Sequence, residues 1–163
     1  MGVVNTKSTI ITNGDATPPA LTGSFINGGR LQEQAAKVSV ESADDNNSVY
    51  RMFRVPSNAR VSQLLIKNDA ITNGTDFNIG IYDTAENGGA VIDDNCFADA
   101  VDLSSANNVY TDLSQIDETN AEKQIWELAG LSSDPRKLVD VCLTGIAVGS
   151  AQGDIAGLFR YVI

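Results

Sequence analysis

The residue types that carry most enzyme chemistry are scarce in this 163-residue sequence, which has no histidine and only two cysteines, Cys96 and Cys142. Without histidine, neither a Ser-His-Asp nor a Cys-His nucleophile can be assembled. A zinc site would also lack enough suitable ligands. The two cysteines have no CxxC neighbour; a disulfide between them stays open, but two small buried hydrophobic side chains are the favoured interpretation. Catalysis would therefore have to depend on carboxylates or lysines.

Two short acidic segments are the candidates for a cation site, Asp44-Asp45-Asn46-Asn47 and Asp93-Asp94-Asn95. Neither has the alternating acids, the mid-loop glycine and the distal glutamate of an EF-hand loop. Both fall between expected strands, where Asp and Asn side chains cap turns. Among 21 acids, no pair is marked out by sequence as a glycosidase pair. We therefore expect no enzyme, no cofactor and no metal site.

The elements that would position any site are strands. Residues 48–55 are rich in β-branched and aromatic residues and stop at Pro56, and residues 61–67 form a second apolar run. Residues 76–83 alternate strictly between apolar and other residues, and Asn87-Gly88-Gly89 favours a tight reversal. Three strands at such short spacing predict an antiparallel sheet.

These same residues carry a resemblance to a known family, the decoration or cement proteins on the heads of tailed bacteriophages. It covers about the middle third of the chain, and looser similarity extends to Asn27-Gly28-Gly29-Arg30 and to Phe97-Ala98 through Asp102-Leu103. The closest runs are Val49-Tyr-Arg-Met-Phe-Arg-Val-Pro-Ser-Asn-Ala-Arg-Val-Ser62, Asn68-Asp-Ala-Ile71 and Ile79-Gly-Ile-Tyr-Asp-Thr-Ala-Glu-Asn-Gly-Gly89.

The resemblance implies a virion structural protein that binds the outside of a phage capsid and stabilises it. Its implied partners are the major capsid protein and further copies of itself, as a dimer or trimer. Its implied location is the capsid surface, with the host cytoplasm as the place of assembly. The family brings no catalytic residues, and none are transferred to this sequence.

The rest of the chain predicts more strands and one helix. Alternation marks strands at 36–40, 138–148 and 155–163, and residues 115–129 predict a helix that is capped by Asp117 or Thr119 and ended by Gly130. We expect Trp126 to anchor this helix on the sheet. The fold class is therefore an all-β antiparallel sandwich, jelly-roll-like, with a short peripheral helix. The expected core consists of Val38, Val40, Phe53, Val55, Leu64, Ile66, Phe77, Ile79, Ile81, Val141, Leu143, Ile146, Leu158 and Tyr161.

Residues 1–22 are small and polar and predict an extended N-terminal arm that precedes a single domain at 23–163. The arm's short apolar patches suit a segment that adds to a neighbouring sheet or groove. A disordered terminus without a role is the alternative. The arm residues proposed for the interface are Val3, Val4, Ile10, Ile11, Pro18 and Pro19.

The net charge of −10 is unevenly distributed, because residues 68–122 hold twelve acidic and no basic side chains. Phosphate contacts require Lys and Arg, so this distribution argues against a nucleic-acid partner. The acidic stretch is either a solvated surface or a docking face for a basic partner. No long apolar run or standard export signal is present, so we expect a protein with no membrane partner.

Arg51, Arg54 and Arg60 flank the Pro56 turn and are half of the six arginines. One interpretation is that this arginine-rich region pairs with carboxylates on a neighbouring subunit. The alternative is internal pairing with three acids of the same chain, Asp69, Asp83 or Asp102.

A second function class is a β-sandwich carbohydrate-binding or receptor-binding module of a phage head fibre or tail. Such a module needs exposed aromatic side chains, and aromatics make up only 6% of the sequence. The candidates are Phe25, Tyr50, Tyr82 and Tyr110. Most of them lie on expected strands that would bury them, which favours the capsid-binding interpretation.

Overall fold

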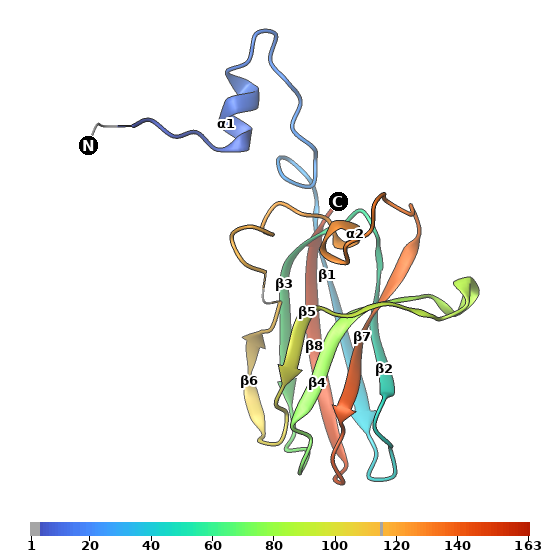
Figure 1. Cartoon of the computed structure of the whole chain (residues 1–163). Helices are drawn as coiled ribbons and strands as arrows, with labels where there is room; N and C mark the ends of the chain where they lie inside the picture. Colours follow the sequence, from blue (N-terminus) through green and yellow to red (C-terminus); the bar gives the residue numbers. More distant parts are fainter. Residues whose placement is uncertain (1–3, 115) are drawn as a thin grey trace.

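The computed structural model describes residues 4–114 and 116–163, and two four-stranded antiparallel sheets form its body (Figure 1). The strand orders are β1-β8-β3-β6 and β2-β7-β4-β5. The first strand thus pairs with the eighth, the second with the seventh, the third with the sixth and the fourth with the fifth, which is a jelly roll. The predicted all-β sandwich is confirmed. The elements are α1 (Thr9–Gly14), β1 (Leu31–Val40), β2 (Ser48–Pro56), β3 (Arg60–Asn68), β4 (Asp76–Asp83), η1 (Ala85–Asn87), β5 (Val91–Val101), β6 (Asn107–Asp112), α2 (Ile125–Leu128), β7 (Leu138–Ala147) and β8 (Gly153–Val162).

The core lies between the two sheets and is centred on an aromatic cluster. The ring centroid of Phe159 lies 5.5 Å from that of Phe53 and 5.9 Å from those of Phe97 and Tyr161. In β8 every second residue from Gly153 to Tyr161 is buried, because successive side chains of a strand point to opposite faces. Burying an apolar side chain of this size contributes roughly 1.5–3 kcal/mol.

Most of the expected core is confirmed, with two errors. Val38 is half-buried and packs against the core. Leu158 is wrong, because it alternates with buried Phe159 and therefore faces outward from the first sheet. Ile146 is also wrong, and Val148 is buried instead. The other eleven expected core residues are all buried.

The predicted helix at 115–129 is mostly wrong; Gln115 lies outside the described residues, and α2 has only four residues. Asp117 caps a turn at Asn120 rather than a helix. The amides of Ile125 and Trp126 instead donate to Ala59 O and Ser57 O in the turn between β2 and β3, so these groups dock the segment on that turn. Gly130, at φ +67°, does follow the helix end.

The expected anchor of α2 is also different. Ile125 is completely buried, whereas Trp126 is half-buried and its Nε1 donates to Gln124 Oε1 at 2.9 Å. The side chain that fastens α2 to the sandwich is therefore Ile125.

The N-terminal arm projects away from the sandwich and includes the short helix α1, which the sequence did not predict (Figure 1). Ser8 begins this helix, and its side chain accepts a hydrogen bond from the amide of Ile11. The described residues show one hydrogen bond between arm and sandwich, from Thr9 Oγ1 to Glu122 Oε2 at 3.0 Å. The arm thus has little contact with the body.

The sandwich has two different ends, which we call the arm end and the far end. The arm, α2 and the C-terminal residue lie at the arm end (Figure 1). The far end consists of four turns between strands (Figure 1), at residues 41–47, 69–75, 102–106 and 148–152.

Candidate interaction surfaces

A β-bulge in β2 brings Arg51 and Arg54 onto the same outer face. Residues three apart in a regular strand face opposite sides. Here Arg51 pairs with Cys142 and Phe53 with Val141, so two residues of β2 oppose one residue of β7. The extra residue turns Arg54 to the side of Arg51. The bulge is thus what makes an arginine pair possible.

Both arginines bind one carboxylate, that of Asp140 on β7. Arg54 donates from Nε to Oδ1 at 2.7 Å and from Nη2 to Oδ2 at 3.1 Å, and Arg51 Nη1 donates to Oδ2 at 2.9 Å. Asp140 is only 3% exposed. Burial by itself would raise the pKa of Asp140, but the hydrogen bonds and positive charges of Arg54 and Arg51 outweigh it and hold this pKa below its ordinary value.

Two guanidinium groups on one carboxylate leave a local excess of positive charge. Arg54 is half-exposed, and the hydrogen bond and charge of Asp140 raise the pKa of Arg54. The internal-pairing alternative is therefore right for Arg51 and Arg54, but the partner acid is wrong. Asp140 was not among the three expected acids, because it lies more than eighty residues away in the sequence.

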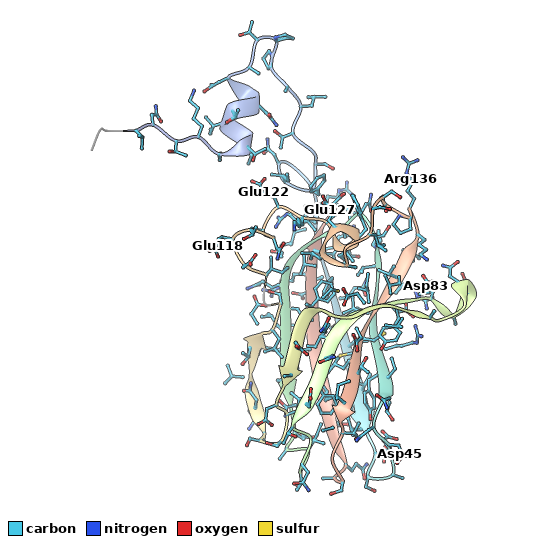
Figure 2. The ribbon with its side chains drawn as sticks, viewed as in Figure 1. Asp45, Asp83, Glu118, Glu122, Glu127 and Arg136 are labelled. Atoms are coloured by element: carbon cyan, nitrogen blue, oxygen red, sulfur yellow. The ribbon has the colours of Figure 1, made fainter. Side chains whose placement is uncertain are left out.

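Arg51 also holds the tip of the β4–β5 hairpin, residues 84–90. It donates to the backbone oxygens of Asp83 at 2.8 Å and Gly89 at 2.9 Å, and it lies 5.6 Å from the centroid of the Tyr82 ring. Lys137 forms an ion pair with the Asp83 carboxylate. Figure 2 shows Asp83 at the base of this projecting hairpin. The cluster thus ties β2, β7 and the hairpin together.

Beyond the hairpin, β5 lies close against the outer side of β4. Between the pairs Ile79–Ala98 and Ile81–Asp93, β4 advances two residues while β5 advances five, which is an extended bulge. A Cβ atom on Gly80 would lie 2.1 Å from Asp93 O, so only glycine allows this approach. The segment Asp93-Asp94-Asn95, expected between strands, therefore lies within β5.

Arg60 lies apart from the other two arginines and binds the backbone at the point where the arm joins the sandwich. Its Nε donates to Phe25 O at 2.7 Å. The backbone of Arg30 pairs in both directions with that of Ile163. Gly29 fits where a Cβ atom would lie 2.4 Å from Ser24 O. These contacts fix residues 23–30, which we call the collar, to the sandwich.

The arm exposes the apolar residues that the sequence proposed for an interface. Val4 and Ile11 are exposed, Ile10 is partly exposed, and Leu21 is 98% exposed. Ile10, Ile11 and Leu21 are among the residues that line a hollow in the arm. Pro18 and Pro19 are also exposed, whereas Val3 lies outside the described residues.

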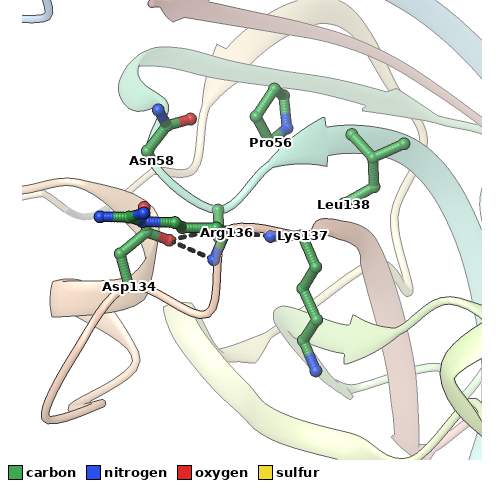
Figure 3. A pocket seen from close by; sticks show the side chains of 7 residues that line it. Pro56, Asn58, Asp134, Arg136, Lys137 and Leu138 are labelled. Atoms are coloured by element: carbon green, nitrogen blue, oxygen red, sulfur yellow. Dashed lines mark hydrogen bonds between the residues drawn. The ribbon is translucent and has the colours of Figure 1, made fainter.

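Polar groups at the arm end form hydrogen bonds with one another. A hollow of about 370 Å³ lies at the arm end, and Figure 3 shows the side chains that line it. Ser57 beside it donates to Asp134 Oδ1 at 2.5 Å, and the same oxygen accepts from the amide of Arg136 at 2.8 Å.

No three His, Cys, Asp or Glu side chains of the described residues gather as a metal-binding group. Within residues 4–114 and 116–163, no helix is long and apolar enough to span a bilayer.

The acidic segments and the cysteines also contribute to the structure. Asp44 accepts hydrogen bonds from Tyr50 Oη at 2.8 Å and from the amide of Glu41 at 3.0 Å, so it caps the turn after β1. Cys96 is half-buried, Cys142 is buried, and both are free thiols. Burial raises the pKa of Cys142 to about 12 and also raises that of Cys96. Both thiols therefore stay protonated at neutral pH.

Most of the candidate sugar-binding aromatics offer no free ring face. Tyr50 and Tyr82 are buried, as their strand neighbours predicted. Phe25 is half-buried in the collar. Tyr110 is exposed on β6, but Lys67 Nζ lies 4.9 Å from the centroid of its ring.

No family model and no curated protein matches this sequence. Among solved structures, the fold is similar to a chain in the capsid of Ralstonia phage GP4, with a TM-score of 0.56 and 16% identity over 82% of this chain and 84% of that chain. A chain of the cyanophage Pam1 capsid asymmetric unit gives a TM-score of 0.47 at 16% identity, over 100% of this chain and 99% of that one. The acid-stable capsid of Helicobacter pylori bacteriophage KHP30 gives 0.36 at 16% identity, over 82% and 94%. The first similarity supports the jelly-roll assignment.

Proposed function

We propose that this chain is a non-enzymatic structural protein of a phage virion, which binds the outside of the capsid and stabilises it as a decoration or cement protein. Its proposed partners are the major capsid protein and further copies of itself. Its proposed location is the capsid surface. The observation that carries the proposal is the arm, which holds apolar side chains in water beside a sandwich whose own core is closed.

Two further observations support the same function. The fold is similar to that of a chain in the Ralstonia phage GP4 capsid, and the middle third of the sequence resembles head decoration proteins. The buried acid Asp140 is fully engaged in hydrogen bonds with Arg51 and Arg54 within the sandwich, which suits a structural role. Attachment by weak contacts becomes tight when symmetry repeats them.

Sedimentation with phage heads tests the proposal. Heads of the phage that encodes this chain, prepared without it, are mixed with the full-length protein and pelleted. We expect the protein to pellet with the heads and to raise the temperature at which they disassemble. The arm variant Ile11→Ser/Leu21→Ser should bind less, while Val109→Ser, an exposed residue on β6, should bind as the parent protein does.

Absence of binding by the full-length protein would contradict a capsid role. A glycan-binding screen would then test the carbohydrate-binding alternative. Equal binding by the arm variant and the parent would instead show that the arm does not contribute to the capsid interface.

A further inference from the structure

We propose that the sandwich docks end-on, with the arm end on the shell protein of the capsid and the four far-end turns facing solvent. This inference rests on the proposed function and adds the orientation of the molecule. The two ends differ in both apolar exposure and charge, and each difference is observed independently.

Exposed apolar side chains are concentrated at the arm end. Seven of the eleven exposed large hydrophobic residues lie there, in the arm and at the ends of β1, β7 and β8. They are Val4, Ile10, Ile11, Leu21, Leu31, Leu138 and Ile163. An exposed apolar surface of this kind marks an interaction site in a soluble protein.

The far end has the opposite character. Its large apolar residues Ile71, Leu103 and Val148 are all buried and close the core. Its four turns contain five acids and no Lys or Arg: Glu41, Asp44, Asp45, Asp69 and Asp102. Figure 2 shows Asp45 at this end. Beside the turns, Lys37 and Lys67 line a hollow together with Asp69 and Asp154, so the acids of the turns exceed the nearby bases. A surface with an excess of carboxylates, and with no exposed large apolar residue in the turns themselves, is suited to water.

The arm end carries mixed charge. Figure 2 shows Arg136 projecting at this end, and Glu118 and Glu122 on the neighbouring loop. Arg30 at the root of the arm is also exposed. A partner there meets charges of both signs, so the contact depends mainly on apolar burial. The partner that fits is a shell subunit with an apolar groove on its outer surface.

The collar supports the same direction of docking. Arg60 and the paired backbones of Arg30 and Ile163 hold the root of the arm against the sandwich. The arm therefore leaves the body at a defined point beside Leu31 and Ile163. Arm and strand ends can then contact one partner together.

Two pairs of substitutions test this orientation on the sandwich itself, with the arm intact. Leu31→Ser/Leu138→Ser removes apolar contacts at the arm end, where these residues are 62% and 48% exposed. Val109→Ser/Val49→Ser is the matched control away from that end, at 72% and 38% exposed. We expect the first pair to weaken binding to heads by about tenfold, as loss of a central interface contact does. The control should stay within about twofold.

An epitope inserted between Ser42 and Ala43 supplies a second measurement. Both residues are exposed in a far-end turn. The inserted protein should bind heads normally, and an antibody should then bind the head-attached protein as it binds the free protein. Thermal melting of each variant confirms that it is folded.

The outcomes separate the two proposals. If the parent protein does not bind heads, the proposed function fails and the orientation with it. If the parent binds but the epitope is hidden on heads, or if only the control pair weakens binding, the end-on orientation is wrong while the capsid role stands.

Discussion

Asp140 shows how one buried residue organises the outer face of a sheet. Its carboxylate receives hydrogen bonds from Arg51 and Arg54, and Arg51 in turn holds the hairpin tip through Gly89. Removing a charged partner from a buried site leaves the other groups without their partner and costs more than the pair gains by forming. The stability of this region therefore depends on the ionised state of one acid.

Asp140→Asn should lower the free energy of unfolding at neutral pH by about 1–3 kcal/mol, because a charged acceptor of three hydrogen bonds becomes a neutral amide. The folded-state pKa is lowered, so the stabilisation is complete above the unfolded pKa of about 3.9 and is lost as the pH falls through the folded pKa. Urea unfolding at neutral and acid pH measures the free energies of unfolding of the parent and of Asp140→Asn. The difference between these two free energies should shrink at acid pH.

Asp99→Asn is the matched control for this substitution, because Asp99 is exposed on β5. It should change the stability by less than about 0.5 kcal/mol. A difference between parent and Asp140→Asn that stays constant in acid would contradict the role of the carboxylate charge.

Gly80→Ala tests the close contact between β4 and β5. The new Cβ atom would lie 2.1 Å from Asp93 O and 2.3 Å from Asp94 C, and backbone atoms cannot rotate away. We expect Gly80→Ala to lower the free energy of unfolding by at least about 2 kcal/mol, as measured by urea unfolding. Gly14→Ala, with no atom within 4 Å, should change stability by less than about 0.5 kcal/mol. Equal stability of parent and Gly80→Ala would show that β5 moves freely.

At the scale of elements, bulges and a side-chain amide shape the edges of the sandwich. Gln34 on β1 donates from Nε2 to Arg54 O at 2.8 Å and accepts from Arg54 N at 3.3 Å, so its amide occupies backbone groups at the edge of β2. Exposed edges invite pairing with another chain, and covering them prevents it. The bulge in β2 thus places Arg54 both for Asp140 and for this edge contact.

The arm is the element with the weakest attachment, and its deletion tests this. Removing residues 1–22 deletes the Thr9–Glu122 hydrogen bond and no buried apolar residue among those that the structure describes. The free energy of unfolding should change by less than about 1 kcal/mol, because one exposed hydrogen bond contributes little. Thermal melting of the two proteins measures the effect. A drop of more than about 4 °C would show that the arm belongs to the folded body.

At the scale of the whole molecule, charge sets the colloidal behaviour. The net charge is −10 at pH 7, and the four far-end turns contain five acids and no Lys or Arg. Mutual repulsion keeps such a protein dispersed at neutral pH.

Light scattering across an acid-to-neutral pH series tests this behaviour. Scattering should be low at neutral pH and should peak near the isoelectric point of about 4.2, where repulsion vanishes. Added salt should raise scattering at neutral pH, because it screens the repulsion. Strong association at neutral pH and low salt would show instead that apolar contacts of the arm end dominate in solution.

The sequence by itself determined the class of the fold and excluded the histidine-dependent nucleophiles. Alternation in residues such as Phe77, Ile79 and Ile81 specifies one buried face, because the side chains of a strand have a period of two. The absence of histidine excludes Ser-His-Asp and Cys-His nucleophiles through composition alone. These properties depend on residue type and local spacing, which a sequence contains in full.

Only the tertiary structure decided where the arginines act and which face Leu158 occupies. The bulge in β2 depends on its register with β7, whose partner residues are more than eighty positions away, and no local pattern encodes such a register. The same holds for Arg60, which reaches back to Phe25 in the collar. Helix signals at 117–129 were overridden because the β2–β3 turn supplies backbone acceptors for Ile125 and Trp126. Contacts between distant segments compete with local preference, and here the distant contacts prevail.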